Sequence, residues 1–121
     1  MPDVNDPLFP ECLQWIRYAE GSIMQQVNVL VVETILLPPE KKNDINVARA
    51  SKLLNVALKN VDNRLQDRDY LVGNFTAADI MTGHACYGAK RAGADTSEMK
   101  NLNLYIDRLL ERPAFKKASS L

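Results

Sequence analysis

Apolar side chains recur every three to four residues through most of the chain, a spacing that places them on one face of an α-helix. The first stripe extends from Leu8 to Leu37 and ends at Pro38-Pro39, because proline donates no N–H and restricts the residue before it. Its members are Cys12, Ile16, Ala19, Ile23, Val27, Leu30 and Thr34. A β-branched cluster inside it would also suit a strand: Val27, Val29, Val31 and Val32. The helical period continues through this cluster and favours one long helix.

The same period predicts further helices downstream. The second follows the polar turn EKKND, where Asn43, Asp44 or Asn46 is suited to cap its first turn. The third starts at Thr76, and Pro113 suits the first turn of a short last helix. Core-facing positions of the second and fourth helices are Val47, Ala50, Leu54, Ala57, Val61, Leu65, Met99, Leu102, Ile106, Leu109 and Leu110. The predicted fold class is all-α, a bundle of four to five helices.

The third helix begins with the strongest local signal in the chain, GNFTAADI. Thr76 as N-cap and Asp79 three residues later form the pattern of a capping box, in which each side chain accepts a hydrogen bond from the other's backbone N–H. Phe75 before the cap and Ile80 after it are placed as a hydrophobic staple. We therefore expect Thr76 at the helix boundary and Ile80 turned away from water.

Small side chains make the third helix narrow, which lets neighbouring helices approach closely. They are Ala77, Ala78, Gly83, Ala85, Cys86 and Gly88. Because each glycine costs about 1 kcal/mol in helix propensity, tertiary packing has to hold this helix. We expect it to lie at the centre of the bundle.

Composition narrows the class of protein without assigning a chemistry. With 121 residues, 46% of them hydrophobic, the chain is large enough for one domain, which we place at residues 8–121 after a linker at residues 1–7. Fifteen basic and fifteen acidic residues give no net charge, so neither nucleic acid nor a membrane surface is an expected partner. One histidine and two separated cysteines, Cys12 and Cys86, match no metal-binding spacing. We expect a cytoplasmic protein with buried, inert thiols and no metal or cofactor.

Several stretches, in order, resemble the C-terminal helical domain of the cytosolic glutathione transferases. GNFTAADI looks like the capping box and staple of that family's sixth helix, and LQWIRYAEGSIMQQ looks like its long fourth helix. RDYLVGNFTAADIM and LYIDRLLERPAFKKA are similar to the segments before the sixth helix and at the end of the domain. The resemblance extends from about Leu8 to Ala118.

The resemblance implies a function for the complete protein. In this family an N-terminal thioredoxin-like domain binds glutathione, the co-substrate, and activates its thiol, while the helical domain forms the wall of the electrophile pocket. No catalytic residue is therefore expected in this chain, which should not conjugate glutathione alone. Expected partners are that N-terminal domain or a second copy in a homodimer, and a hydrophobic small molecule. The alternatives are a non-catalytic interaction module of the translation or synthetase-complex type, and a dimer that holds apolar molecules without turning them over.

The resemblance also places the pocket wall, on Met24 and Gln25 in the first helix and on Met81 and His84 in the third. Two thioethers would give an adaptable apolar surface, although methionines at such positions also serve as core filler. For His84 we favour a packed side chain with one backbone hydrogen bond over a ligand contact. Arg17 would reach toward glutathione of a neighbouring subunit, or belong to a solvated helix face.

Overall fold

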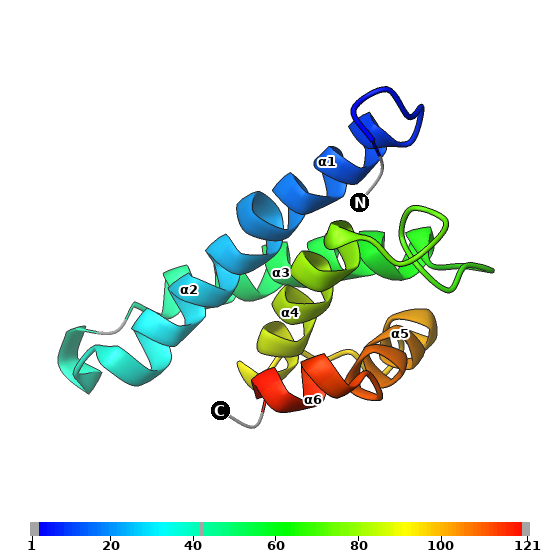
Figure 1. Ribbon diagram of the computed structural model, residues 1–121. Coiled ribbons are helices and arrows are strands. Elements are labelled where there is room, and N and C mark those ends of the chain that lie inside the picture. The colour runs from blue at the N-terminus through cyan, green and yellow to red at the C-terminus, as the bar shows by residue number, and fades with distance from the viewer. Residues whose placement is uncertain (1–2, 42, 120–121) are drawn as a thin grey trace.

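The computed structural model describes residues 3–41 and 43–119 as a bundle of helices (Figure 1). Residues 1–2 of the predicted linker, Lys42 of the turn before the second helix, and residues 120–121 at the end of the predicted domain lie outside this description. The elements are α1 (Phe9–Tyr18), η1 (Ala19–Met24), α2 (Gln25–Val31), η2 (Val32–Leu36), η3 (Pro39–Lys41), α3 (Asp44–Arg64), α4 (Ala77–Arg91), α5 (Lys100–Leu110) and α6 (Pro113–Ser119). The described residues contain helices and no strand, and the predicted all-α class is confirmed.

The first four elements form one continuous helical segment, in which η1 is a π-helical turn between α1 and α2, and η2 is a second one that follows α2. The segment ends where Leu37 becomes extended before Pro38, as the prolines predicted. Cys12, Ala19, Ile23, Val27 and Leu30 all face the core.

The expectation that Thr34 continues this buried stripe is wrong. Thr34 is exposed, its hydroxyl donates back to the Leu30 carbonyl, and Glu33 is buried in its place. The physical reason lies at the start of α3, where Asn43 N–H donates to Glu33 Oε2 at 2.9 Å and Asn46 Nδ2 to Oε1 at 3.3 Å. A buried carboxylate with such partners is tolerated, and its negative charge suits a helix N-terminus.

Helix α3 begins at one of the three predicted caps. The Asn43 side chain accepts hydrogen bonds from the backbone N–H groups of Ile45 and Asn46, at 2.9 and 3.2 Å. These groups have no partner within the helix, and a cap of this kind supplies one. From this start α3 packs its apolar face against α2 and α5.

Helix α4 lies in the middle of the bundle, with the α1–η2 segment on one side and α5 and α6 on the other (Figure 1). Thr76 is its N-cap, and the capping box with Asp79 is present. The Thr76 N–H donates to Asp79 Oδ2 at 2.9 Å, and the Ala78 N–H donates to the Thr76 hydroxyl at 3.2 Å. The helix therefore has a fixed start.

Ile80 does not turn away from water as expected, since its side chain is 52% exposed. The inward side of this first turn is taken by Ala78 and by Asp79, which is fully buried, and the following position points outward. Ile80 and Phe75 instead line one surface pocket. The predicted burial of Ile80 is wrong.

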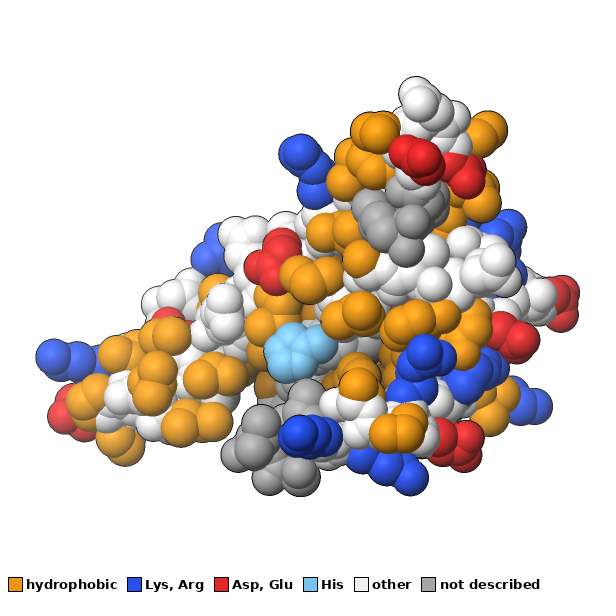
Figure 2. Space-filling model, viewed as in Figure 1, with side chains coloured by type: hydrophobic (Ala, Val, Ile, Leu, Met, Phe, Trp, Pro, Cys, Tyr) orange, Lys and Arg blue, Asp and Glu red, His pale blue; other side chains and the backbone are white. Residues whose placement is uncertain are grey.

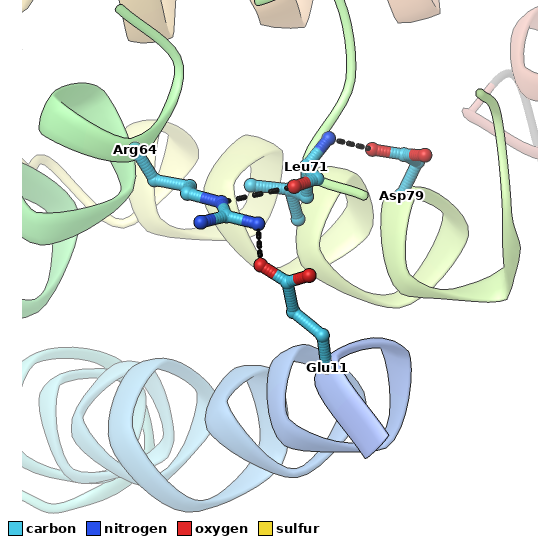
Figure 3. Close-up of polar contacts among 4 residues, drawn as sticks. All are labelled: Glu11, Arg64, Leu71 and Asp79. Atoms are coloured by element: carbon cyan, nitrogen blue, oxygen red, sulfur yellow. Dashed lines mark hydrogen bonds and ion pairs between the residues drawn. The ribbon is translucent and has the colours of Figure 1, made fainter. Parts of the chain in front are cut away.

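A polar network ties the start of α4 to α1 and α3 (Figure 3) and also to α5. Arg64, at the end of α3, forms an ion pair with Glu11 of α1 and donates from Nε to the Leu71 carbonyl at 3.0 Å. The Leu71 N–H donates to Asp79 Oδ1 at 3.1 Å, and the Tyr105 hydroxyl of α5 donates to the same oxygen at 2.8 Å. Side chains from α3 and α4 thus hold the loop between these two helices at Leu71. These contacts fix the position of the first turn of α4.

Candidate functional site

The outward face of α4 carries two of the predicted pocket residues, one turn apart. Met81 is half-buried and His84 is exposed. The favoured interpretation of His84 as a packed histidine is wrong, because the buried sides of this helix are filled by Ala78, Thr82 and Ala85 and leave position 84 facing outward. Figure 2 shows the chain's single histidine near the middle of one face, among hydrophobic side chains.

Met81 and His84 border an apolar pocket of about 590 Å³ between α4 and α6. Its lining residues are Phe75, Ile80, Met81, His84, Tyr87, Gly88, Arg91, Arg112, Ala114 and Phe115. The volume lies within the usual range for small-molecule sites, about 300–1,000 Å³. Gly88 borders open space, since a Cβ built there would meet no atom within 4 Å.

The other predicted site residues lie elsewhere. Met24 is partly buried and packs against the core, whereas Gln25 and Arg17 are exposed on the first helical segment. None of these three lines the pocket. The structure therefore brings together Met81 and His84 of the predicted set and leaves Met24, Gln25 and Arg17 outside the pocket.

Sequence reasoning missed several residues of this pocket. Tyr87 and Arg91 follow His84 at three and seven residues, which is the spacing of one helix face, and this signal could have been found. Arg112 and Phe115 come from the end of the chain and reach α4 only through the tertiary fold. No local pattern points to them.

Two arginines lie over aromatic rings at this pocket. The Arg112 guanidinium lies 3.6 Å from the Phe75 ring centroid, and the Arg91 guanidinium lies 5.9 Å from that of Tyr87. Tyr87 also meets Phe115 edge to face, with ring centroids 6.1 Å apart. An aromatic face attracts a cation at short distance, so the Arg112 guanidinium is held beside the apolar space, and the Arg91 guanidinium lies at the outer limit of such a contact.

Neither cysteine belongs to the pocket. Cys12 and Cys86 are both fully buried, and burial raises the pKa of the Cys86 thiol to about 12. Since the thiolate is the reactive form, Cys86 is not activated for chemistry. Within residues 3–41 and 43–119, no group of three or more His, Cys, Asp or Glu side chains is arranged to hold a metal ion. Nor is any helix in these ranges long and apolar enough to cross a membrane.

The raised pKa of Cys86 makes stability depend on alkaline pH. Above its ordinary value of 9.0 the unfolded thiol loses its proton, while the folded thiol keeps it up to about pH 12. Unfolding then releases a proton, so the free energy of unfolding should fall by up to about 1.4 kcal/mol per pH unit in this window. Urea titrations at pH 8, 9.5 and 10.5 should show a smaller decline for Cys86→Ala than for the wild type. Equal declines would contradict the buried thiol.

The helices packed around α4 define the class of protein as an all-helical domain built around a central capped helix. The family model described as "Glutathione S-transferase, C-terminal domain" matches residues 25–113. This match covers well over half of the chain, and the chain belongs to that family. A comparison with curated protein sequences finds no match.

Three solved structures of bacterial glutathione transferases have the same fold. That from Pseudomonas putida, solved with one glutathione disulfide bound per subunit, has 18% sequence identity and a TM-score of 0.84 over 95% of this chain and 52% of its own. That from Methylococcus capsulatus has 20% identity and a TM-score of 0.83 over 99% and 57%. That from Burkholderia graminis, solved with two glutathione molecules bound per subunit, has 20% identity and a TM-score of 0.80 over 89% and 48%. The chain thus spans about half the length of the structures that it matches.

Proposed function

We propose that the chain is the electrophile-binding domain of a glutathione transferase whose complete form joins glutathione to hydrophobic electrophiles. The observation that carries this proposal is the apolar pocket on α4, bordered by Met81 and His84. A flexible thioether beside aromatic and aliphatic walls suits varied hydrophobic molecules. The family, together with the glutathione disulfide bound in one similar structure and the glutathione bound in another, supports the reaction class.

The chain alone is proposed to be inactive. Glutathione reacts as its thiolate, which needs a donor or a positive field to lower the thiol pKa, and we assign this role to an N-terminal thioredoxin-like domain. That domain would correspond to the part of the similar structures that this chain does not span. Met24, Gln25 and Arg17 would contribute only where such a domain or a second subunit faces the α1–α2 segment, and a cytoplasmic homodimer is the expected setting.

A domain-joining experiment tests this proposal. The N-terminal half of the Methylococcus capsulatus transferase would be fused to this chain, and conjugation of chlorodinitrobenzene would be measured for the fusion, the chain alone and the N-terminal half alone. We expect activity above the uncatalysed rate only in the fusion. Retention on immobilised glutathione verifies that the N-terminal half has folded.

A variant then locates the electrophile site within the fusion. Met81→Glu places a charge in the apolar pocket and should raise KM for chlorodinitrobenzene about tenfold, a loss of ~1.4 kcal/mol of binding. KM for glutathione should be unchanged. Leu53→Glu, an exposed position on α3, is the matched control. A glutathione-binding fusion without activity, or equal effects of both variants, would contradict the proposal.

One observation favours a second candidate, a non-catalytic interaction module. Large apolar side chains are exposed around η2 and the start of α3, at the end of the molecule on the left of Figure 2. They are Val32, Ile35, Leu36 and Ile45, with Ile35 71% and Ile45 76% exposed. Contiguous apolar surface of this kind marks contact sites. Sedimentation at several concentrations, on the wild type and on Ile35→Ser/Ile45→Ser, would show whether this surface drives self-association.

A further inference from the structure

Four large apolar side chains form an uncovered end of the molecule, called here the apolar end. They are Val32, Ile35, Leu36 and Ile45, and the last three are 71%, 68% and 76% exposed. Single exposed apolar side chains are ordinary on a protein surface, whereas a group of them marks a contact site. Figure 2 shows hydrophobic side chains gathered at this end of the molecule, on the left.

A buried carboxylate holds the apolar end in a fixed shape. Glu33 accepts hydrogen bonds from the Asn43 N–H at 2.9 Å and from Asn46 Nδ2 at 3.3 Å. These bonds tie η2 to the start of α3, so the two elements that carry the apolar side chains keep one arrangement. A surface that is already ordered avoids part of the entropy cost of binding. The apolar end is therefore preformed for a contact.

The shape of the molecule narrows the choice of partner. Figure 1 shows η2 and the turn after it projecting away from α4, α5 and α6. A specific interface buries about 800 Å² on each partner, which is more than two projecting ends of four apolar side chains supply when they meet. A concave apolar site contacts such an end on several sides and buries more of its surface. The apolar end thus suits a pocket better than a second apolar end.

The pocket between α4 and α6 is a concave apolar site on the same chain. Its volume is about 590 Å³, and Phe75, Ile80, Met81 and Phe115 contribute apolar surface to it. Because the apolar end projects away from α4 and α6 (Figure 1), the end of one chain does not reach the pocket of that chain. A second copy can supply the end that this pocket accepts.

We propose that the apolar end of one copy of this chain docks in the pocket between α4 and α6 of a second copy. This inference goes beyond the proposed function, because the contact requires neither glutathione nor an electrophile. Two different surfaces meet in it. Each copy offers one end and one pocket, so the contacts either close between two copies or continue from copy to copy.

Sedimentation equilibrium of the chain tests whether copies associate. The wild type would be measured from about 10 to 500 μM, a range suited to the weak affinity of a small interface. We expect the average mass to rise with concentration. A protein that stays monomeric over this whole range would overturn the proposal.

Two variants test the two surfaces separately. Ile35→Ser/Ile45→Ser removes apolar surface from the end, and Ile80→Glu places a charge at the pocket. Each should weaken self-association about tenfold or more. All three side chains are exposed, so the fold should be retained, and a negative charge is favourable near the N-terminus of α4.

Leu104→Glu on α5 is the matched control for Ile80→Glu. Leu104 and Ile80 have the same exposed fraction, 52%, and Leu104 does not line the pocket. This variant should leave the association unchanged. Association that is weakened by the end variant but not by Ile80→Glu would show a contact between two ends and overturn the proposal. Equal losses for Leu104→Glu and Ile80→Glu would show unspecific apolar association, with the same consequence.

Mixing the two variants separates a contact between unlike surfaces from one between like surfaces. Ile80→Glu retains an intact apolar end, and Ile35→Ser/Ile45→Ser retains an intact pocket. Each variant should be monomeric alone at a concentration where an equal mixture forms a complex of one copy of each. With a fluorescent label on one variant, sedimentation velocity would detect this complex. A mixture that remains monomeric at concentrations where the wild type associates would overturn the docking of end in pocket.

Discussion

Replacing Asp79 by alanine is expected to lower the free energy of unfolding by about 4–6 kcal/mol. The Asp79 carboxylate is fully buried and accepts hydrogen bonds from Thr76 N–H, Leu71 N–H and the Tyr105 hydroxyl. Alanine would leave all three donors buried without a partner, and each unsatisfied donor costs about 1–3 kcal/mol. Because small domains are stable by only about 5–15 kcal/mol, this loss would remove a large share of the free energy of unfolding.

Three milder variants divide this effect among the contacts. Tyr105→Phe removes one donor and should cost about 1–2 kcal/mol, and Thr76→Ala removes the cap at a similar cost. Asp79→Asn keeps the size and one acceptor oxygen but loses the charge, so it should fall between these and Asp79→Ala. Urea unfolding followed by circular dichroism measures all four. An Asp79→Ala protein no less stable than Tyr105→Phe would show that the carboxylate does not hold the loop.

The same contacts link stability to the candidate site. Asp79 fixes both the first turn of α4 and the preceding loop at Leu71, and Met81 and His84 follow within the next two turns. A frayed first turn would displace these residues and open the pocket. Loss of ligand binding in an Asp79 variant is therefore expected as a consequence of unfolding, and it does not identify Asp79 as a ligand contact.

Much of the fold follows from local sequence rules. The 3.6-residue period located the helices, Pro38 ended the first of them, and the side chains of Asn43 and Thr76 cap α3 and α4 as their positions indicated. These features depend on interactions within a few residues, which a sequence displays directly. The period also identified most of the core, because the helical stripes of a bundle face one another.

The wrong predictions of burial concern residues whose exposure is set by a neighbouring element of the fold. Glu33 is buried because the start of α3 supplies donors, and a carboxylate within an apolar stripe gives no hint of this. Ile80 and His84 are exposed because they border the open pocket between α4 and α6. The pocket itself depends on α6 and the residue before it. Phe115 and Arg112 lie about thirty residues from His84 in sequence, a separation that no periodic pattern spans.

Gly83→Ala and Gly88→Ala are expected to change stability in opposite directions, although both add one methyl group to α4. At Gly83 a Cβ would lie 2.3 Å from Leu109 Cδ1, far inside van der Waals contact. Leu109 is 1% exposed and has little room to turn, so the overpacking should cost about 1–3 kcal/mol. At Gly88 the space is open, and the gain in helix propensity should stabilise by up to about 1 kcal/mol.

A double variant tests the cause of this difference. Leu109→Ala alone should cost about 2–5 kcal/mol through the cavity it leaves, but it removes the atom that Gly83→Ala would meet. In that background Gly83→Ala should become neutral or stabilising, because the helix propensity gain remains and the clash is gone. The coupling energy from the cycle should be about 1–3 kcal/mol, measured by urea unfolding of the four proteins, whereas Gly88→Ala should add independently of Leu109. A Gly83→Ala penalty that persists beside Leu109→Ala would mean that the close approach of α4 and α5 is not what requires glycine there.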